Sequence, residues 1–66
     1  MTPDLLALQR MGLNYLAYDE SSRMVVAAFQ HPDSRDRWFA SGAGLWIKKA
    51  YVDHDVLTVV AGETGL

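Results

Sequence analysis

The first half of the chain moves from a helical to an extended hydrophobic pattern. Residues 2–12, TPDLLALQRMG, place Leu5 and Leu8 three positions apart behind a Thr-Pro-Asp start, as in a short helix. Residues 13–19 are rich in Tyr and Leu, and residues 24–30 form an apolar run after a polar segment that contains Ser-Ser. The pattern therefore predicts a helix followed by a two-stranded hairpin with a longer loop.

The same order of patterns returns in the second half. Residues 31–42 begin with His-Pro-Asp and carry Trp-Phe, which supplies the apolar face of a second helix. Residues 45–52 and 56–62 are apolar and predict two strands, and the Asp53-His54-Asp55 segment between them predicts a turn. Each half therefore resembles one helix–hairpin unit.

The two units define the expected fold. Residues 2–29 and 31–61 share a Pro-Asp helix start, a Gly-Leu strand start and a Val-Val-Ala strand, which we interpret as an internal repeat. We expect an α+β fold with the order αββαββ, in which a four-stranded antiparallel sheet carries two short helices on one face. Residues 1–62 are expected to form a single compact domain, and residues 63–66 a flexible C-terminal tail.

The segment ASGAGLWIKK, residues 40–49, raises the question of a phosphate-binding loop. Such a loop lies between a strand and the N-terminus of a helix, whereas Gly42 and Gly44 follow a helix and precede a strand. We therefore expect these glycines to give the backbone a left-handed turn. By the same reading of helix ends, Thr2 and Asp33 are the expected N-caps, and Gly12 is the expected end of the first helix.

Two adjacent lysines interrupt the predicted strand at residues 45–52. In a regular strand each face would mix apolar residues with one lysine. A β-bulge at Lys48-Lys49 would instead turn all the strong apolar positions inward, and we predict this bulge. The alternative is a regular strand in which one lysine lays its aliphatic stem along the core.

The apolar pattern of two predicted strands indicates that one face of the sheet is uncovered. Residues 24–29 and 56–61 are apolar on both sides, while two short helices on one face would leave the other open. An open apolar face is typical of an interface. We expect a protein-binding surface that includes Tyr15, Tyr18, Trp46, Lys48 and Tyr51. The alternative is a sheet twisted enough for the second helix and the tail to cover that face.

Composition narrows the class of protein. The chain has 66 residues, half of them apolar, no Cys and a formal net charge of −2. A domain this small is marginally stable and cannot use disulfides, so a homodimer or a larger protein partner is expected. No signal peptide or membrane-spanning run is visible, which favours a cytoplasmic protein without membrane contact.

The side chains that could carry chemistry do not form a recognisable set. Asp53 and Asp55 flank His54, but adjacent turn residues diverge, so we expect no metal site, no cofactor and no enzymatic activity. We also expect the two hairpin tips to form an acidic rim from Asp19, Glu20, Asp53 and Asp55. The sequence thus predicts a small regulatory or interaction module. The alternative is single-stranded nucleic-acid binding on the Trp, Tyr and Lys face, which the net negative charge disfavours.

Overall fold

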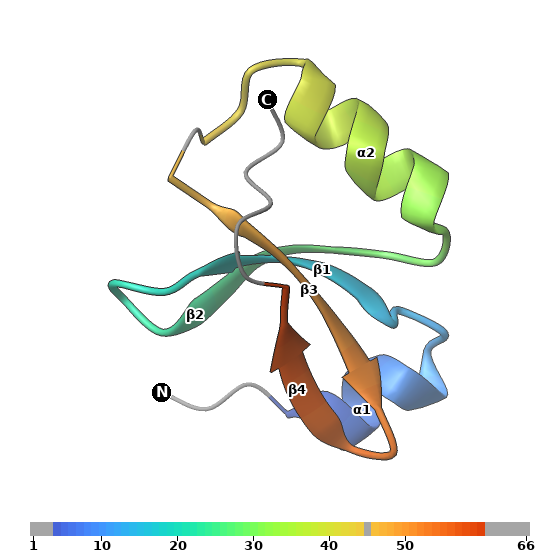
Figure 1. Ribbon diagram of the computed structural model, residues 1–66. Coiled ribbons are helices and arrows are strands. Elements are labelled where there is room, and N and C mark those ends of the chain that lie inside the picture. The colour runs from blue at the N-terminus through green and yellow to red at the C-terminus, as the bar shows by residue number, and fades with distance from the viewer. Residues whose placement is uncertain (1–3, 45, 61–66) are drawn as a thin grey trace.

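The computed structural model describes residues 4–44 and 46–60, which form six elements. They follow the order α1 (Leu5–Arg10), β1 (Tyr15–Asp19), β2 (Met24–Phe29), α2 (Pro32–Ala40), β3 (Lys48–Asp53) and β4 (Val56–Val59) (Figure 1). The strands pair antiparallel in the order β2-β1-β3-β4. The predicted α+β fold with a four-stranded antiparallel sheet is confirmed. Within the described ranges, neither helix is long and apolar enough to cross a membrane.

The two helices lie on opposite faces of the sheet. Leu16 forms a buried cluster with Ala50 and Val52, against which Leu5 and Leu8 of α1 pack. The next residue, Ala17, belongs instead to a cluster with Ile47 and with Phe39 of α2.

Consecutive strand residues point to opposite faces, so the expectation of both helices on one face was wrong. The physical reason is that β1 and β3 carry apolar side chains on both faces. One helix against each face removes both sets from water. Figure 1 shows α2 above the central strands and α1 below them.

Helix α1 begins and ends with well-defined caps. The Asp4 carboxylate accepts a hydrogen bond of 3.1 Å from the Ala7 N–H, so Asp4 is the N-cap and the expected cap Thr2 lies outside the described residues. At the other end Gly12 has a φ of +77°. Its N–H donates to the Gln9 carbonyl, and the Leu13 N–H donates to the Leu8 carbonyl, each at 2.9 Å. This is the Schellman arrangement, which confirms Gly12 as the end of the helix.

Helix α2 begins two residues earlier than expected. His31 is extended, with a φ of −129°, and occupies the N-cap without a side-chain hydrogen bond. Pro32 follows at the first helical position, where its missing N–H costs nothing. Asp33 therefore lies inside the first turn and is not the cap, which corrects the sequence-based expectation. Gly42 and Gly44 have φ values of +86° and +70°, as the predicted left-handed turn requires.

The strand register contains one irregularity, and it is not at the lysines. The β1–β3 ladder runs unbroken from the Tyr15–Tyr51 pair to the Tyr18–Lys48 pair. The predicted bulge at Lys48-Lys49 was therefore wrong. Each face of the sheet has its own helix, so β3 can bury side chains on both faces. No bulge is needed to move all its apolar side chains to one face. The irregularity lies in the β1–β2 ladder, where Val26 is the extra residue between the Ala17–Ala27 and Tyr18–Val25 pairs.

Candidate functional site

The five residues expected on one binding face divide between both faces. Tyr15 and Tyr51 lie directly opposite each other in the β1–β3 ladder, and Tyr18 and Lys48 form another pair of that ladder. The two pairs are an odd number of positions apart along β1, so they face opposite sides of the sheet. Tyr18 packs against the cluster on the α1 side, which places Tyr15 and Tyr51 on the α2 side. Trp46 precedes β3.

On the α2 side, Tyr15 is covered by an arginine. The Arg35 guanidinium lies 5.6 Å from the centre of the Tyr15 ring, and its Nη1 donates a 2.7 Å hydrogen bond to the Ala50 carbonyl. Only 11% of the Arg35 side chain is exposed. Sequence reasoning missed this role, because Arg35 stands between the polar residues Ser34 and Asp36 and has the pattern of a surface residue. Tyr15 is therefore partly covered by α2, while Tyr51 is more exposed, at 37%.

The two lysines serve the two faces separately. Lys49 lies on the α2 side, 2.9 Å from Asp36 Oδ1 and above the Phe39 ring. Lys48 lies on the α1 side, 2.7 Å from Glu20 Oε2. The structure thus agrees with the alternative of a regular strand in which a lysine stem is partly buried. Both lysines show this, Lys48 on one face and Lys49 on the other.

Trp46 is the most exposed of the large apolar side chains that the structure describes, at 71%. It lies within a tight turn in which the Ile47 N–H donates to the Gly44 carbonyl at 2.9 Å. Ile47 itself is buried against Phe39 and Ala17. A Cβ at Gly44 would collide with Ile47 Cγ1, so the turn requires glycine there. Trp46 is consequently an exposed ring next to a residue that is packed in the core.

Further apolar side chains are exposed on both edge strands. Met24 and Val26 lie on β2, and Val56 lies on β4. We did not identify these edges from the sequence, because pattern alone does not show which strands are central. The available signal was the complete lack of charge in residues 24–29.

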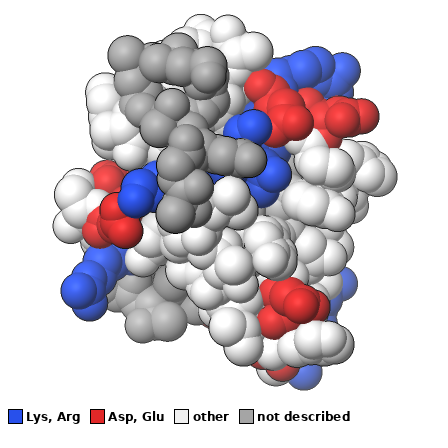
Figure 2. Space-filling view, viewed as in Figure 1, with Lys and Arg blue, Asp and Glu red and all other residues white. Residues whose placement is uncertain are grey.

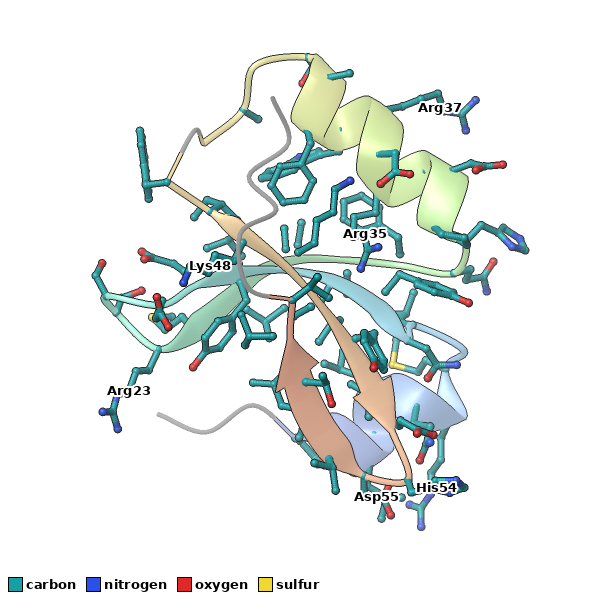
Figure 3. All side chains as sticks on the ribbon, viewed as in Figure 1. Arg23, Arg35, Arg37, Lys48, His54 and Asp55 are labelled. Atoms are coloured by element: carbon teal, nitrogen blue, oxygen red, sulfur yellow. The ribbon has the colours of Figure 1, made fainter. Side chains whose placement is uncertain are left out.

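The acidic residues do not form a common rim. Asp19 and Glu20 lie at the β1–β2 loop, whereas Asp53 and Asp55 lie at the β3–β4 turn. Because β1 and β3 run antiparallel, these two tips are at opposite ends of the sheet, and the expected rim was wrong. In Figure 3 Arg23 marks the first tip at the left and Asp55 the second at the bottom. Figure 2 shows the charged side chains in separate groups of mixed sign, with uncharged surface between them.

The Asp19 carboxylate orders the β1–β2 loop through hydrogen bonds. Asp19 accepts hydrogen bonds from the Ser22 and Ser21 hydroxyls, both at 2.8 Å, and from the Ser21 N–H at 3.1 Å. These bonds, led by that of Ser22, hold the pKa of Asp19 below its usual range. The negative charge is therefore used to order the loop.

The turn Asp53-His54-Asp55 is shaped by its backbone. His54 and Asp55 have φ values of +50° and +65°, as in a two-residue hairpin turn of the primed type. His54 Nε2 lies 3.4 Å from Asp53 Oδ1 on an exposed surface. Among the described residues there is no group of three or more His, Cys, Asp or Glu side chains able to hold a metal ion.

Comparisons with protein-family models, with curated proteins and with solved structures find no match for this chain. A functional proposal therefore depends on the geometry described above.

Proposed function

We propose that this protein is a small non-enzymatic interaction module that binds a partner protein through a surface centred on Trp46. The observation that carries the proposal is the 71% exposure of this indole next to the buried Ile47. Trp is enriched among the residues that dominate binding energy, because it buries a large area with few rotatable bonds. A ring on a rigid support loses little conformational freedom on binding.

The surroundings of Trp46 supply the rest of such a surface. Lys48, two residues later, pairs with Tyr18 across the ladder and with Glu20 of the β1–β2 loop. Trp46 therefore precedes β3 at the end of the sheet where this loop and its partly exposed Lys48–Glu20 ion pair lie. A large apolar anchor next to a polar rim is the usual composition of a protein interface. Tyr15 and Tyr51, on the other face, are not part of this surface.

Single-stranded nucleic-acid binding has less support. Base stacking on an open sheet needs several aromatic rings on one face and free positive charge beside them. Here Tyr18 and Tyr51 lie on opposite faces, and Lys48 and Lys49 are engaged by Glu20 and Asp36. Binding of single-stranded oligonucleotides at low salt, lost on Trp46→Ala substitution, would overturn the proposal of a protein partner.

The test compares Trp46→Ala with Met11→Ala, since Met11 is also largely exposed but follows α1. The wild-type protein and both variants are used to capture partners from an extract of the source cells, and the affinity of each captured protein is then measured with purified components. We expect a partner that binds wild type and Met11→Ala alike, and binds Trp46→Ala about 30-fold more weakly, the effect of a hot-spot residue near 2 kcal/mol. Equal affinity for all three proteins would contradict a role for Trp46, and failure of the wild type to capture any protein would contradict the module.

A further inference from the structure

Strand β2 is an edge of the sheet that lacks most of the usual protection against pairing. It comprises six residues, MVVAAF, without charge and without proline, and its outer side has no neighbouring strand among the described residues. Val26 is half exposed, at 49%. Edge strands are normally protected by charges, proline or a cover, because their free N–H and C=O groups can pair with another chain. Among the described residues the bulge at Val26 is the one protective feature of this edge, and the segment after it is regular.

We propose that β2 pairs antiparallel with β2 of a second copy of this chain, so that two four-stranded sheets form one sheet of eight strands. The proposal concerns a different surface from Trp46 and does not rest on the function proposed above. It predicts a dimer in which both Trp46 surfaces remain available to other proteins.

The hydrogen-bond pattern fixes where the two strands would meet. The Val52 N–H donates to the Asn14 carbonyl at 2.9 Å, so the backbone polar groups of Asn14 and, by alternation, of Leu16 point toward β3. The backbone N–H and C=O groups of Tyr15 and Ala17 then point toward β2. The backbone groups of their partners, Phe29 and Ala27, point back toward β1.

The N–H and C=O of Ala28 consequently point outward. Ala28 lies after the bulge, in the regular part of β2. A two-fold axis at Ala28 would let the two copies of this residue exchange both hydrogen bonds, with Ala27 opposite Phe29 on the other face.

Self-complementarity favours a second copy as the occupant of this edge. β2 is apolar on both faces, so the strand beside it must also be apolar on both faces, and β2 itself meets this requirement. The other edge, β4, has only four residues and contains Thr58. Pairing around a two-fold axis also closes the assembly, whereas β2–β4 pairing would continue into a fibre.

Charge complementarity favours the same arrangement. Arg23 precedes β2 by one residue, and Asp33 lies in the first turn of α2, four residues beyond the end of β2. Neither side chain has an ion-pair partner in the part of the chain that the structure describes. In Figure 3 Arg23 points away from the chain. In the register centred on Ala28, Arg23 comes five residues before the axis and Asp33 five residues after it. Arg23 of each copy then comes to the same end as Asp33 of the partner subunit.

The first experiment is the molar mass in solution over a dilution series for wild type, Val26→Lys and Val56→Lys. Both substitutions place the same charge on an exposed valine of an edge strand, and circular dichroism verifies that each variant folds. We expect a dimer for wild type and Val56→Lys, with Val26→Lys at least tenfold weaker in self-association. A monomeric wild type, a Val26→Lys dimer of unchanged affinity, or equal weakening by Val56→Lys would each overturn the proposal.

The second experiment tests the register. Arg23→Glu and Asp33→Arg each place like charges together across the axis, and we expect each to weaken the dimer several-fold. The double variant Arg23→Glu/Asp33→Arg restores opposite charges and should recover the wild-type affinity. Slow amide exchange of Ala28 that appears only at dimer concentrations is the independent readout. Lack of recovery together with fast exchange at Ala28 would reject this register. Trp46→Ala should leave the dimer intact, which separates failure of this proposal from failure of the proposed function.

Discussion

Leu16 and Ala17 are neighbours in β1, and the structure buries both side chains completely, at 0% exposure. Neighbouring strand residues point to opposite faces, so the sheet is covered from both sides at this position. Leu16 contributes to the cluster under α1, and Ala17 to the cluster under α2. The pair therefore lies at the centre of three layers, α1, the sheet and α2. Each helix packs on the sheet through a small buried cluster.

Enlarging Ala17 should destabilise the fold. Ala17 is completely buried against Phe39 and Ile47, so a larger side chain would have to displace them. We expect Ala17→Leu to lower the free energy of unfolding by about 1–3 kcal/mol. Ala40→Leu, at the exposed end of α2, is the matched control and should change it by less than about 0.5 kcal/mol. Urea denaturation measures both, and similar losses in the two variants would show that Ala17 is not tightly packed.

The order and type of the elements could be predicted from the sequence, whereas the side of the sheet that each helix takes could not. Helix starts at Pro-Asp, helix ends at glycine and apolar strands are local signals, and they placed six elements in the right order. β2 is apolar on both faces, so its pattern does not distinguish one covered face from two. The face that each helix covers depends on the direction the chain takes after Gly12 and Gly44. Packing of the whole domain decides that direction.

The candidate site could be predicted only in part for the same reason. Trp46 was expected on an open face of the sheet; it is exposed, but it lies in the turn before β3. The division of Tyr15 and Tyr18 between two faces follows from their odd spacing, but the cover over Tyr15 comes from Arg35 of a distant helix. The separation of the two acidic tips depends on the pairing of β1 with β3, a contact between distant parts of the chain.

Two glycines of the α2–β3 connection should respond differently to alanine. Both have positive φ, so each substitution carries a backbone cost of about 1 kcal/mol. At Gly42 the new Cβ would meet open space, whereas at Gly44 it would collide with Ile47 Cγ1. We therefore expect Gly44→Ala to lower the free energy of unfolding by clearly more than Gly42→Ala, and also to change the fluorescence of Trp46. Equal effects would mean that Ile47 moves aside freely.

The two lysine ion pairs should differ in strength. Lys49 is 18% exposed and pairs with Asp36, while Lys48 is 30% exposed and pairs with Glu20. Both carboxylates are mostly exposed, so solvent screens both pairs. Double-mutant cycles with Lys→Met, Asp36→Asn and Glu20→Gln should give a coupling of about 0.5–1 kcal/mol for Lys49–Asp36 and less for Lys48–Glu20. A stronger coupling at Lys48 would contradict the view that Lys49 fastens α2 to the sheet.

The β1–β2 loop should become less stable in acid. Hydrogen bonds from the Ser22 and Ser21 hydroxyls lower the pKa of Asp19 from its ordinary value of 3.8. A carboxyl whose pKa is lower in the folded state stabilises that state above the ordinary value, and the contribution is lost as pH falls through the folded pKa. We expect Ser22→Ala to raise the pKa of Asp19 in an NMR titration, and Ser34→Ala in α2 to leave it unchanged. An Asp19 pKa unaffected by Ser22→Ala would show that the hydroxyl does not bond the carboxylate in solution.

The β3–β4 turn should be open to stabilisation. His54 and Asp55 both hold positive φ, which costs an L-residue with a side chain roughly 1 kcal/mol, less for Asp. Asn-Gly is the preferred sequence for a two-residue turn of this kind. We expect His54→Asn/Asp55→Gly to raise the free energy of unfolding by about 1 kcal/mol, measured by urea denaturation, without altering the β3–β4 register. Asp55→Ala should act in the opposite direction, because alanine lacks both the freedom of glycine and the local hydrogen bonding of aspartate. A loss of stability with Asn-Gly would mean that the side chains of this turn, rather than its backbone, hold the hairpin.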